Sequence, residues 1–132
     1  MALHGWTKFD NGLSGFEEFV RSLDLPVPSL LAPVVAGLEF VGGIMIVLGL
    51  LTRVPALLIA IEMVFTALLV KITKLDLGIL GPEGSGGAEV DFLYLSIFFA
   101  LFILGPGRTS LDAAFGIEGR LSRSDEPARV TA

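Results

Sequence analysis

The chain has 132 residues, of which 53% are hydrophobic and 17% charged, and its formal net charge is −5. An average soluble domain is about 45–50% apolar and about 25% charged, so this composition excludes most soluble classes and indicates one integral membrane domain. The absence of cysteine excludes disulfides and thiolate metal centres, the single histidine argues against a metal site, and the pI of about 4.7 argues against a nucleic-acid partner.

A short amphipathic helix is expected near the N-terminus. Ser14 and Glu17 have the spacing of a capping box, and Pro26 ends the helical pattern. Apolar side chains recur at helical spacing at Phe16, Phe19, Val20 and Leu23. Such a helix lies on the membrane surface or covers the mouth of a bundle, and the sequence leaves both arrangements open.

Two longer apolar segments predict transmembrane helices. Residues 30–51 would extend about 33 Å as a helix, enough for a hydrocarbon core of about 30 Å, and carry one acid, Glu39. Residues 54–70 carry Glu62 near their middle, and we expect this shorter segment to need neighbouring helices, or a protonated Glu62, for insertion.

A third transmembrane helix is predicted over residues 92–104, extended from about Ala88 and ended by Gly105 and Pro106. The glycine-rich residues 81–87 before it form a connector, and Ser110 begins a short helix after it. We therefore predict an all-α integral membrane helical bundle with three full transmembrane helices. Residues 1–120 form the domain, and residues 121–132 form a disordered tail.

The basic residues give a small bias in orientation. One side of the predicted topology carries Arg53, Arg108, Arg120, Arg123 and Arg129. The other side carries Lys8, Arg21, Lys71 and Lys74. The larger number is expected inside, so a multi-pass protein with a cytoplasmic C-terminus is predicted.

Several short patterns fall at the predicted helix ends. In chain order they are His4-Gly5-Trp6 with Lys8, Glu39 with Gly42-Gly43, Gly49-Leu50-Leu51-Thr52-Arg53, Gly86-Gly87 with Glu89, and Gly105-Pro106-Gly107-Arg108 with Ser110-Leu111-Asp112. Together they cover residues 4–112 and resemble the DoxX family of small four-helix bacterial membrane proteins. The resemblance implies a location in the bacterial inner membrane.

Members of that family usually carry an opening transmembrane helix that ends in the His-Gly-Trp-x-Lys pattern. Only three residues precede the pattern in this chain, so we expect an N-terminal helical stub, or a first helix encoded upstream of Met1. A missing helix would leave part of the bundle uncovered. A homo-oligomer or a partner membrane or redox subunit is then expected beside the membrane lipid.

The resemblance also implies an association with membrane redox systems. Relatives are described as thiosulfate:quinone oxidoreductase subunits, or as partners of superoxide dismutase and sulfurtransferase in oxidant defence. No intrinsic cofactor is expected, and a quinone is the candidate bound group. Many members have no assigned activity and a fold does not establish chemistry, so whether the chain is itself an enzyme stays open.

Glu39 and Glu62 are the candidate catalytic residues, because an acid at membrane depth is costly and normally faces the bundle interior. Glu39 lies on a stripe of small residues that would let another helix approach, and Ala36, Gly42 and Gly43 are the candidate helix-packing residues. One hypothesis is that both carboxyl groups face one polar site and that one of them relays a proton. The alternative is that each holds helices together by hydrogen bonds, without turnover.

The candidate ligand-binding residues are His4, Trp6, Glu39, Arg53 and Arg108. His4 beside Trp6 could bind a quinone head group, or Trp6 could be an interfacial anchor. The two arginines could bind lipid phosphate, cap helix carbonyls or pair with an aspartate. An ion pair between Lys8 and the acids at 89 and 91 is also conceivable.

Three functions follow from these patterns. The first is a redox-associated subunit that holds a quinone or a small sulfur compound and supports a partner oxidoreductase. The second is a non-catalytic scaffold of a larger membrane complex. The third is a carrier of protons or small solutes.

Overall fold

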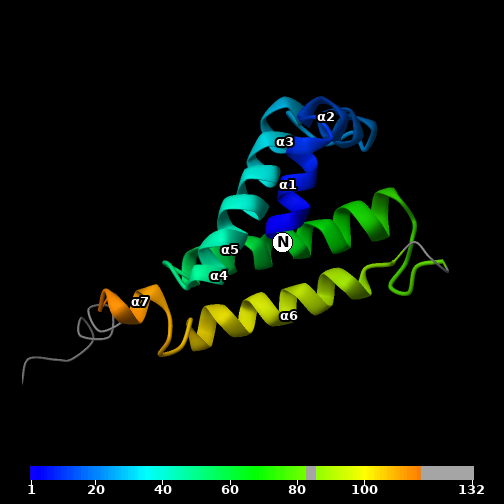
Figure 1. Ribbon diagram of the computed structural model, residues 1–132. Coiled ribbons are helices and arrows are strands. Elements are labelled where there is room, and N and C mark those ends of the chain that lie inside the picture. The colour runs from blue at the N-terminus through cyan, green and yellow to red at the C-terminus, as the bar shows by residue number, and fades with distance from the viewer. Residues whose placement is uncertain (83–85, 117–132) are drawn as a thin grey trace, which may run out of the picture.

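The computed structural model describes residues 1–82 and 86–116, and every regular element within these ranges is helical (Figure 1). The elements are α1 (Ala2–Asp10), α2 (Leu13–Ser22), α3 (Pro28–Gly37), η1 (Leu38–Gly42), α4 (Gly43–Leu48), α5 (Arg53–Phe65), η2 (Thr66–Lys74), α6 (Glu89–Leu104) and α7 (Leu111–Ala114). The predicted all-α helical bundle is confirmed. The predicted tail and the end of the predicted domain lie outside the described residues.

Two continuous helices have the length and composition to cross a membrane. They are Pro28–Leu48 and Arg53–Lys74, with 21 and 22 residues and mean hydropathies of 2.2 and 2.1. Only 28% of the most apolar stretch of each is buried inside the protein, whereas the core helix of a soluble protein would be mostly buried. The exposed apolar sides therefore suit contact with lipid.

The third helix, α6, ends where predicted, because Gly105 adopts a positive φ of 80°. It has 16 residues, about 24 Å, so a third full crossing stays a prediction. The second long helix extends four residues beyond the predicted end, where the cationic Lys71 and Lys74 favour the carbonyl end of the helix. The predicted start of α7 is confirmed, since Ser110 accepts a hydrogen bond from the Ala113 N–H at 3.1 Å.

Helix α2 forms as predicted, but the predicted capping box is wrong. The N-cap is Gly12, and no side chain caps the helix. Glu17 pairs instead with Arg21, one turn further on, at 2.7 Å. Val20 and Leu23 are buried, and α2 packs against α3, so this helix covers part of the bundle.

The helices form two groups (Figure 1). The helix α5–η2 and α6 lie side by side as an antiparallel hairpin, and α1 and α2 lie beside the helix α3–η1–α4. The core consists of Ile59, Ala60, Met63 and Phe98 of the hairpin, and partly buried apolar residues of the other group, Met1, Leu38 and Ile46, pack against it.

Small residues allow α1 to approach η1 and α4 closely. A methyl group on Gly5 would collide with the backbone of Phe40, and one on Gly43 would collide with the backbone of Ala2. Gly42 faces α5, where an added Cβ would lie 3.2 Å from the Pro55 side chain. The helix-packing candidates are thus all buried at helix contacts, Ala36 included.

The end of the bundle away from α2 is held by what we call the loop lock, residues 49–53 with Asp112. The Asp112 carboxylate accepts hydrogen bonds from the backbone N–H groups of Leu51 and Thr52, at 2.7 and 3.0 Å. The Asp112 N–H donates to the Gly49 carbonyl at 2.8 Å. Arg53 donates to two carbonyls at the end of α6, at 2.8 and 3.0 Å. Two of the sequence patterns therefore interlock in space.

Candidate functional site

Five charged side chains from separate elements meet between the two helix groups, and we call them the charged cluster. They are Lys8 of α1, Glu39 of η1, Glu62 of α5, Lys71 of η2 and Asp91 of α6. The two long helices supply three of these residues, and α1 and α6 supply one each. Such a concentration of charge within apolar helices is costly, so it marks the candidate functional site.

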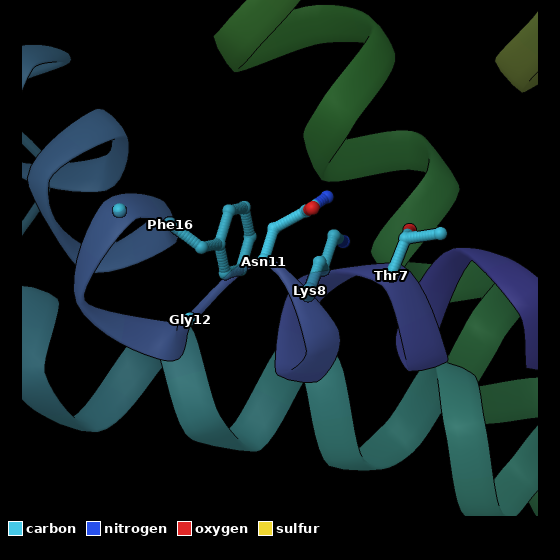
Figure 2. A pocket seen from close by; sticks show the side chains of 6 residues that line it. Thr7, Lys8, Asn11, Gly12 and Phe16 are labelled. Carbon is cyan, nitrogen blue, oxygen red and sulfur yellow. The ribbon is translucent and has the colours of Figure 1, made fainter.

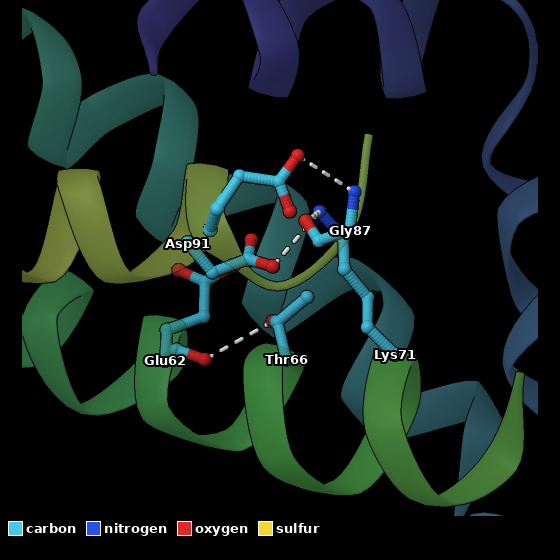
Figure 3. Close-up of polar contacts among 6 residues, drawn as sticks. Glu62, Thr66, Lys71, Gly87 and Asp91 are labelled. Atoms are coloured by element: carbon cyan, nitrogen blue, oxygen red, sulfur yellow. Dashed lines mark hydrogen bonds and ion pairs between the residues drawn. The ribbon is translucent and has the colours of Figure 1, made fainter. Parts of the chain in front are cut away.

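Two ion pairs frame the cluster. Lys8 Nζ lies 2.6 Å from Glu39 Oε2, and the two side chains are 22% and 7% exposed. Lys71 Nζ lies 2.8 Å from Asp91 Oδ2, with side-chain exposures of 20% and 8% (Figure 3). In both pairs the carboxylate is the deeper partner, and the lysine reaches it from a more exposed position.

Glu62 lies between the two ion pairs. Its side chain is within hydrogen-bonding reach of Glu39 and interacts electrostatically with Lys8 and Asp91. Its Oε2 atom is buried and has no hydrogen-bond partner. A hydrogen bond between two carboxyl groups requires a proton on one of them. With three acids and two lysines, the cluster is electrically neutral when it holds one such proton.

The end of the glycine-rich connector is tied to this cluster. Lys71 donates a hydrogen bond to the Gly87 carbonyl at 3.0 Å, in addition to its ion pair. Glu89 accepts from the Gly87 N–H at 3.0 Å (Figure 3). The backbone carbonyl and N–H of Gly87 are therefore hydrogen-bonded by one cluster residue, Lys71, and by Glu89 at the start of α6. Residues 83–85 of the predicted connector lie outside the described residues.

Two of the cluster residues lie in π-helical stretches of the long helices. Glu39 lies in η1, which has five residues, and Lys71 lies in η2, which has nine. The π form is rare and is often found at functional sites, since its wider turn changes the direction in which side chains point. Glu62, which lies between Glu39 and Lys71, comes from the α-helical stretch α5.

The charged side chains of the cluster lie toward one side of the bundle. Glu39 and Glu62 lie near the middle of their long helices, whereas the Lys71–Asp91 pair lies at the end of the α5–α6 hairpin nearest the connector. Toward the loop lock, residues 40–48, 54–61 and 92–104 carry no charged side chain. The charged groups thus extend from one side to about half the span.

A pocket adjoins the cluster at the corner between α1 and α2. It has a volume of about 230 Å³ and is lined by Thr7, Lys8, Asn11, Gly12, Gly15 and Phe16 (Figure 2). Lys8 Nζ lies 4.3 Å from the centre of the Phe16 ring, a cation–π distance. Lys8 therefore contacts both the pocket and the buried Glu39.

The structure brings Glu39 and Glu62 together but does not bring the other predicted ligand residues to them. His4 is exposed, and Trp6 is 51% exposed with its ring 5.6 Å from that of Phe40. Arg53 belongs to the loop lock, and Arg108 is exposed beyond α6. The ligand and catalytic roles of all these residues stay predictions.

The predicted pairing of Lys8 with an acid at 89 or 91 is wrong. The close approach of α1 to η1 brings Lys8 to Glu39, and Asp91 is taken by Lys71 of the neighbouring helix. Lys71 and Asp91 are absent from the predicted site residues. Their signal in the sequence is that Lys71 lies in the last turns of one helix and Asp91 in the first turn of the next, which places them side by side if the two helices form a hairpin.

The fold and the cluster define a small helical membrane protein with charged residues at half-span. Among the described residues, no group of three or more histidine, cysteine, aspartate or glutamate side chains could hold a metal ion. A family model described as DoxX matches residues 1–72, and the chain belongs to the DoxX family, as its sequence patterns indicate.

Two curated proteins extend this assignment. The chain is 33% identical over 110 residues to "Putative oxidoreductase CatD" of Bacillus subtilis, which covers 83% of this chain and 74% of that protein. It is 38% identical over 95 residues to "Uncharacterized membrane protein Rv3486" of Mycobacterium tuberculosis. That match covers 68% of this chain but only 58% of the mycobacterial relative. No solved structure matches the chain.

Proposed function

We propose that this protein is a redox-associated membrane subunit that holds a quinone or a small sulfur compound at the charged cluster and supports electron transfer by a partner oxidoreductase. The observation that carries the proposal is the charged cluster itself, with a buried carboxyl pair at half-span and lysine partners that are more exposed. The name of the Bacillus relative, which includes "oxidoreductase", supports a redox setting.

The chemistry of quinone reduction divides the electron and proton transfers between the partner and this chain. Reducing a quinone to a quinol requires two electrons and two protons. Two thiosulfate ions release two electrons when they join through a new sulfur–sulfur bond. The chain has no cysteine to carry electrons, so the partner would transfer them, and the Glu39–Glu62 pair would pass protons to the quinone oxygens.

We further propose that the protein is a multi-pass protein of a bacterial inner membrane, with its C-terminus in the cytoplasm. The loop lock would then lie on the cytoplasmic side and the Lys71–Asp91 end of the cluster on the outer side. Because the native sequence has no cysteine, single-cysteine variants can test this cleanly. Asp76→Cys should react with an impermeant maleimide in intact cells, and Thr109→Cys should react only after lysis. The reverse pattern would overturn the orientation.

The ligand is tested by purification in mild detergent from bacterial membranes. We expect quinone in the lipid extract of the pure protein and thiosulfate-dependent quinone reduction by the protein with its co-purifying partners. Glu39→Gln should assemble normally and lose this reduction, because glutamine keeps hydrogen bonding but cannot carry a proton. Glu18→Gln, on the exposed side of α2, is the matched control. Absence of both quinone and redox response would refute the proposal.

The second candidate is a non-catalytic scaffold, which the close helix contacts at Gly5 and Gly43 favour. Those contacts and the large exposed apolar sides of the two long helices would suit a structural subunit of a larger complex. A stable co-purifying complex whose activity is unaffected by Glu39→Gln would favour this candidate. It would also remove Glu39 from the mechanism.

A further inference from the structure

The pocket between α1 and α2 has the chemistry of a small anion site. Its polar wall is formed by Thr7, Lys8 and Asn11, while Gly12 and Gly15 place no side chain in it (Figure 2). At about 230 Å³ it is smaller than the roughly 300–1,000 Å³ typical of sites for drug-sized ligands. This size suits a small solute or a single head group.

Lys8 supplies the charge in this wall. Its ammonium group has three N–H donors, one directed to Glu39 and one facing the Phe16 ring, which leaves a third for a ligand. The side chain is 22% exposed, so a solute in the pocket can reach it. A partly desolvated ammonium group binds oxyanions through charge-assisted hydrogen bonds.

We propose that Lys8 binds a small oxyanion in this pocket and that binding is coupled to the uptake of a proton by the Glu39–Glu62 pair. The location of the site rests on the proposed function, which places the ligand at the charged cluster. The proposal adds the ligand class and the coupling, neither of which requires a redox partner.

The coupling follows from charge balance. Before binding, Lys8 neutralises Glu39, whose side chain is only 7% exposed. An oxyanion on the third donor shares the single positive charge of Lys8 with Glu39, so the buried carboxylate is no longer fully neutralised, which is unfavourable unless the pair gains a proton. Glu62 is in direct reach of Glu39, so the second proton can be shared within the pair.

The other charged groups around the pair do not offer a replacement cation. From η2, Lys71 is held by Asp91 of α6 and the Gly87 carbonyl. On α2, which lines the pocket together with α1, Glu17 and Arg21 form an ion pair with each other. Helix α3 has no charged residue. Proton uptake is therefore the available compensation, and oxyanion binding should tighten as the pH falls.

The test uses sulfate as the probe and the full chain in dodecyl maltoside micelles, which contain no phosphate. Isothermal titration calorimetry in two buffers of different protonation enthalpy counts the protons taken up. For each proton taken up per anion, affinity should rise about tenfold per pH unit. Glu39→Gln should bind sulfate at least as tightly, since Lys8 is released, and should lose the pH dependence.

Two variants separate binding from folding. The double variant Lys8→Gln/Glu39→Gln removes the ion pair without leaving a lone charge, and its sulfate affinity should fall at least tenfold. Lys74→Gln, an exposed lysine of η2, is the matched control and should bind as the parent does. Equal affinity in the double variant, or binding without pH dependence in the parent, would overturn the proposal.

A second titration distinguishes a free oxyanion from a lipid head group. Dioctanoyl-phosphatidylglycerol replaces sulfate as the probe in the same micelles. Binding of sulfate assigns the site to a free oxyanion, and binding of the lipid alone assigns it to a head-group phosphate. Binding of neither overturns the proposal. Since no quinone is present in these titrations, this failure would leave the quinone content of the purified protein as a separate test of the proposed function.

Discussion

Replacing Lys8 and replacing Glu39 should lower the free energy of unfolding by different amounts. Lys8→Gln leaves the Glu39 carboxylate buried next to Glu62, with 7% of its side chain exposed. Breaking a buried pair costs about 3–5 kcal/mol, and we expect about 3 kcal/mol here because the acid can take up a proton. Glu39→Gln leaves Lys8 beside an open pocket, where water can solvate it, so the expected cost is about 1 kcal/mol.

The asymmetry can be measured as the free energy of unfolding of each variant in bicelles, by steric trapping or denaturant titration followed by circular dichroism. The double variant should cost less than the sum of the single variants by about 1–2 kcal/mol, since the lone charge is gone. Lowering the pH should reduce the cost of Lys8→Gln. The exposed controls Glu18→Gln and Lys74→Gln should stay within about 0.5 kcal/mol of the parent. Equal costs for the two single variants, or a larger cost for Glu39→Gln, would refute the assigned burial and charge state.

Three further changes test the packing around the cluster. Asp112→Ala removes the carboxylate acceptor of two backbone N–H groups in the loop lock and should lower the free energy of unfolding by about 3 kcal/mol, measured in the same assay. Gly5→Ala should cost about 1–3 kcal/mol because its methyl group meets backbone, whereas Gly37→Ala, where nothing lies within 4 Å, should be neutral or stabilising by up to about 1 kcal/mol; a similar loss at both positions would contradict the close approach of α1. Lys71→Gln should accelerate amide hydrogen exchange at Gly87, because the Gly87 carbonyl loses the hydrogen bond from Lys71 that ties the connector to η2; unchanged exchange would show that Lys71 does not hold the connector in place.

Hydropathy and helix-end chemistry predict most of the helices, because both depend on residues close together in the sequence. Gly105 with Pro106 ends α6 and Ser110 caps α7, as expected from their local conformational preferences. The capping box at Ser14 fails for a comparable reason. Gly12 is itself a good N-cap and lies two residues earlier, so the helix begins before the predicted signal.

The sequence predicts the two acids of the candidate site but not their partners. Glu39 and Glu62 stand out because an acid in an apolar segment is costly wherever the helices pack. Their partners depend on how the helices cross, and that is set by contacts over long sequence separations. Lys8 reaches Glu39 because α1 rests directly on the backbone of η1, and π-helical winding shifts the register of both long helices. The small residues beside Glu39 predict that a helix can approach there but not which helix it is, and the π-helical winding leaves no local pattern in the sequence.

The one-sided form of the cluster bears on which function it can serve. A carrier must expose its site to each side in turn, and the described structure places uncharged, apolar segments and the loop lock between Glu62 and the second side. The Asp112 hydrogen bonds and the Arg53 contacts with α6 would have to break for that side to open. A site that only binds a ligand and exchanges protons with one side needs no such rearrangement. The hydrogen-bonded loop lock and the accessible Lys8 pocket are therefore better suited to a binding subunit than to a carrier.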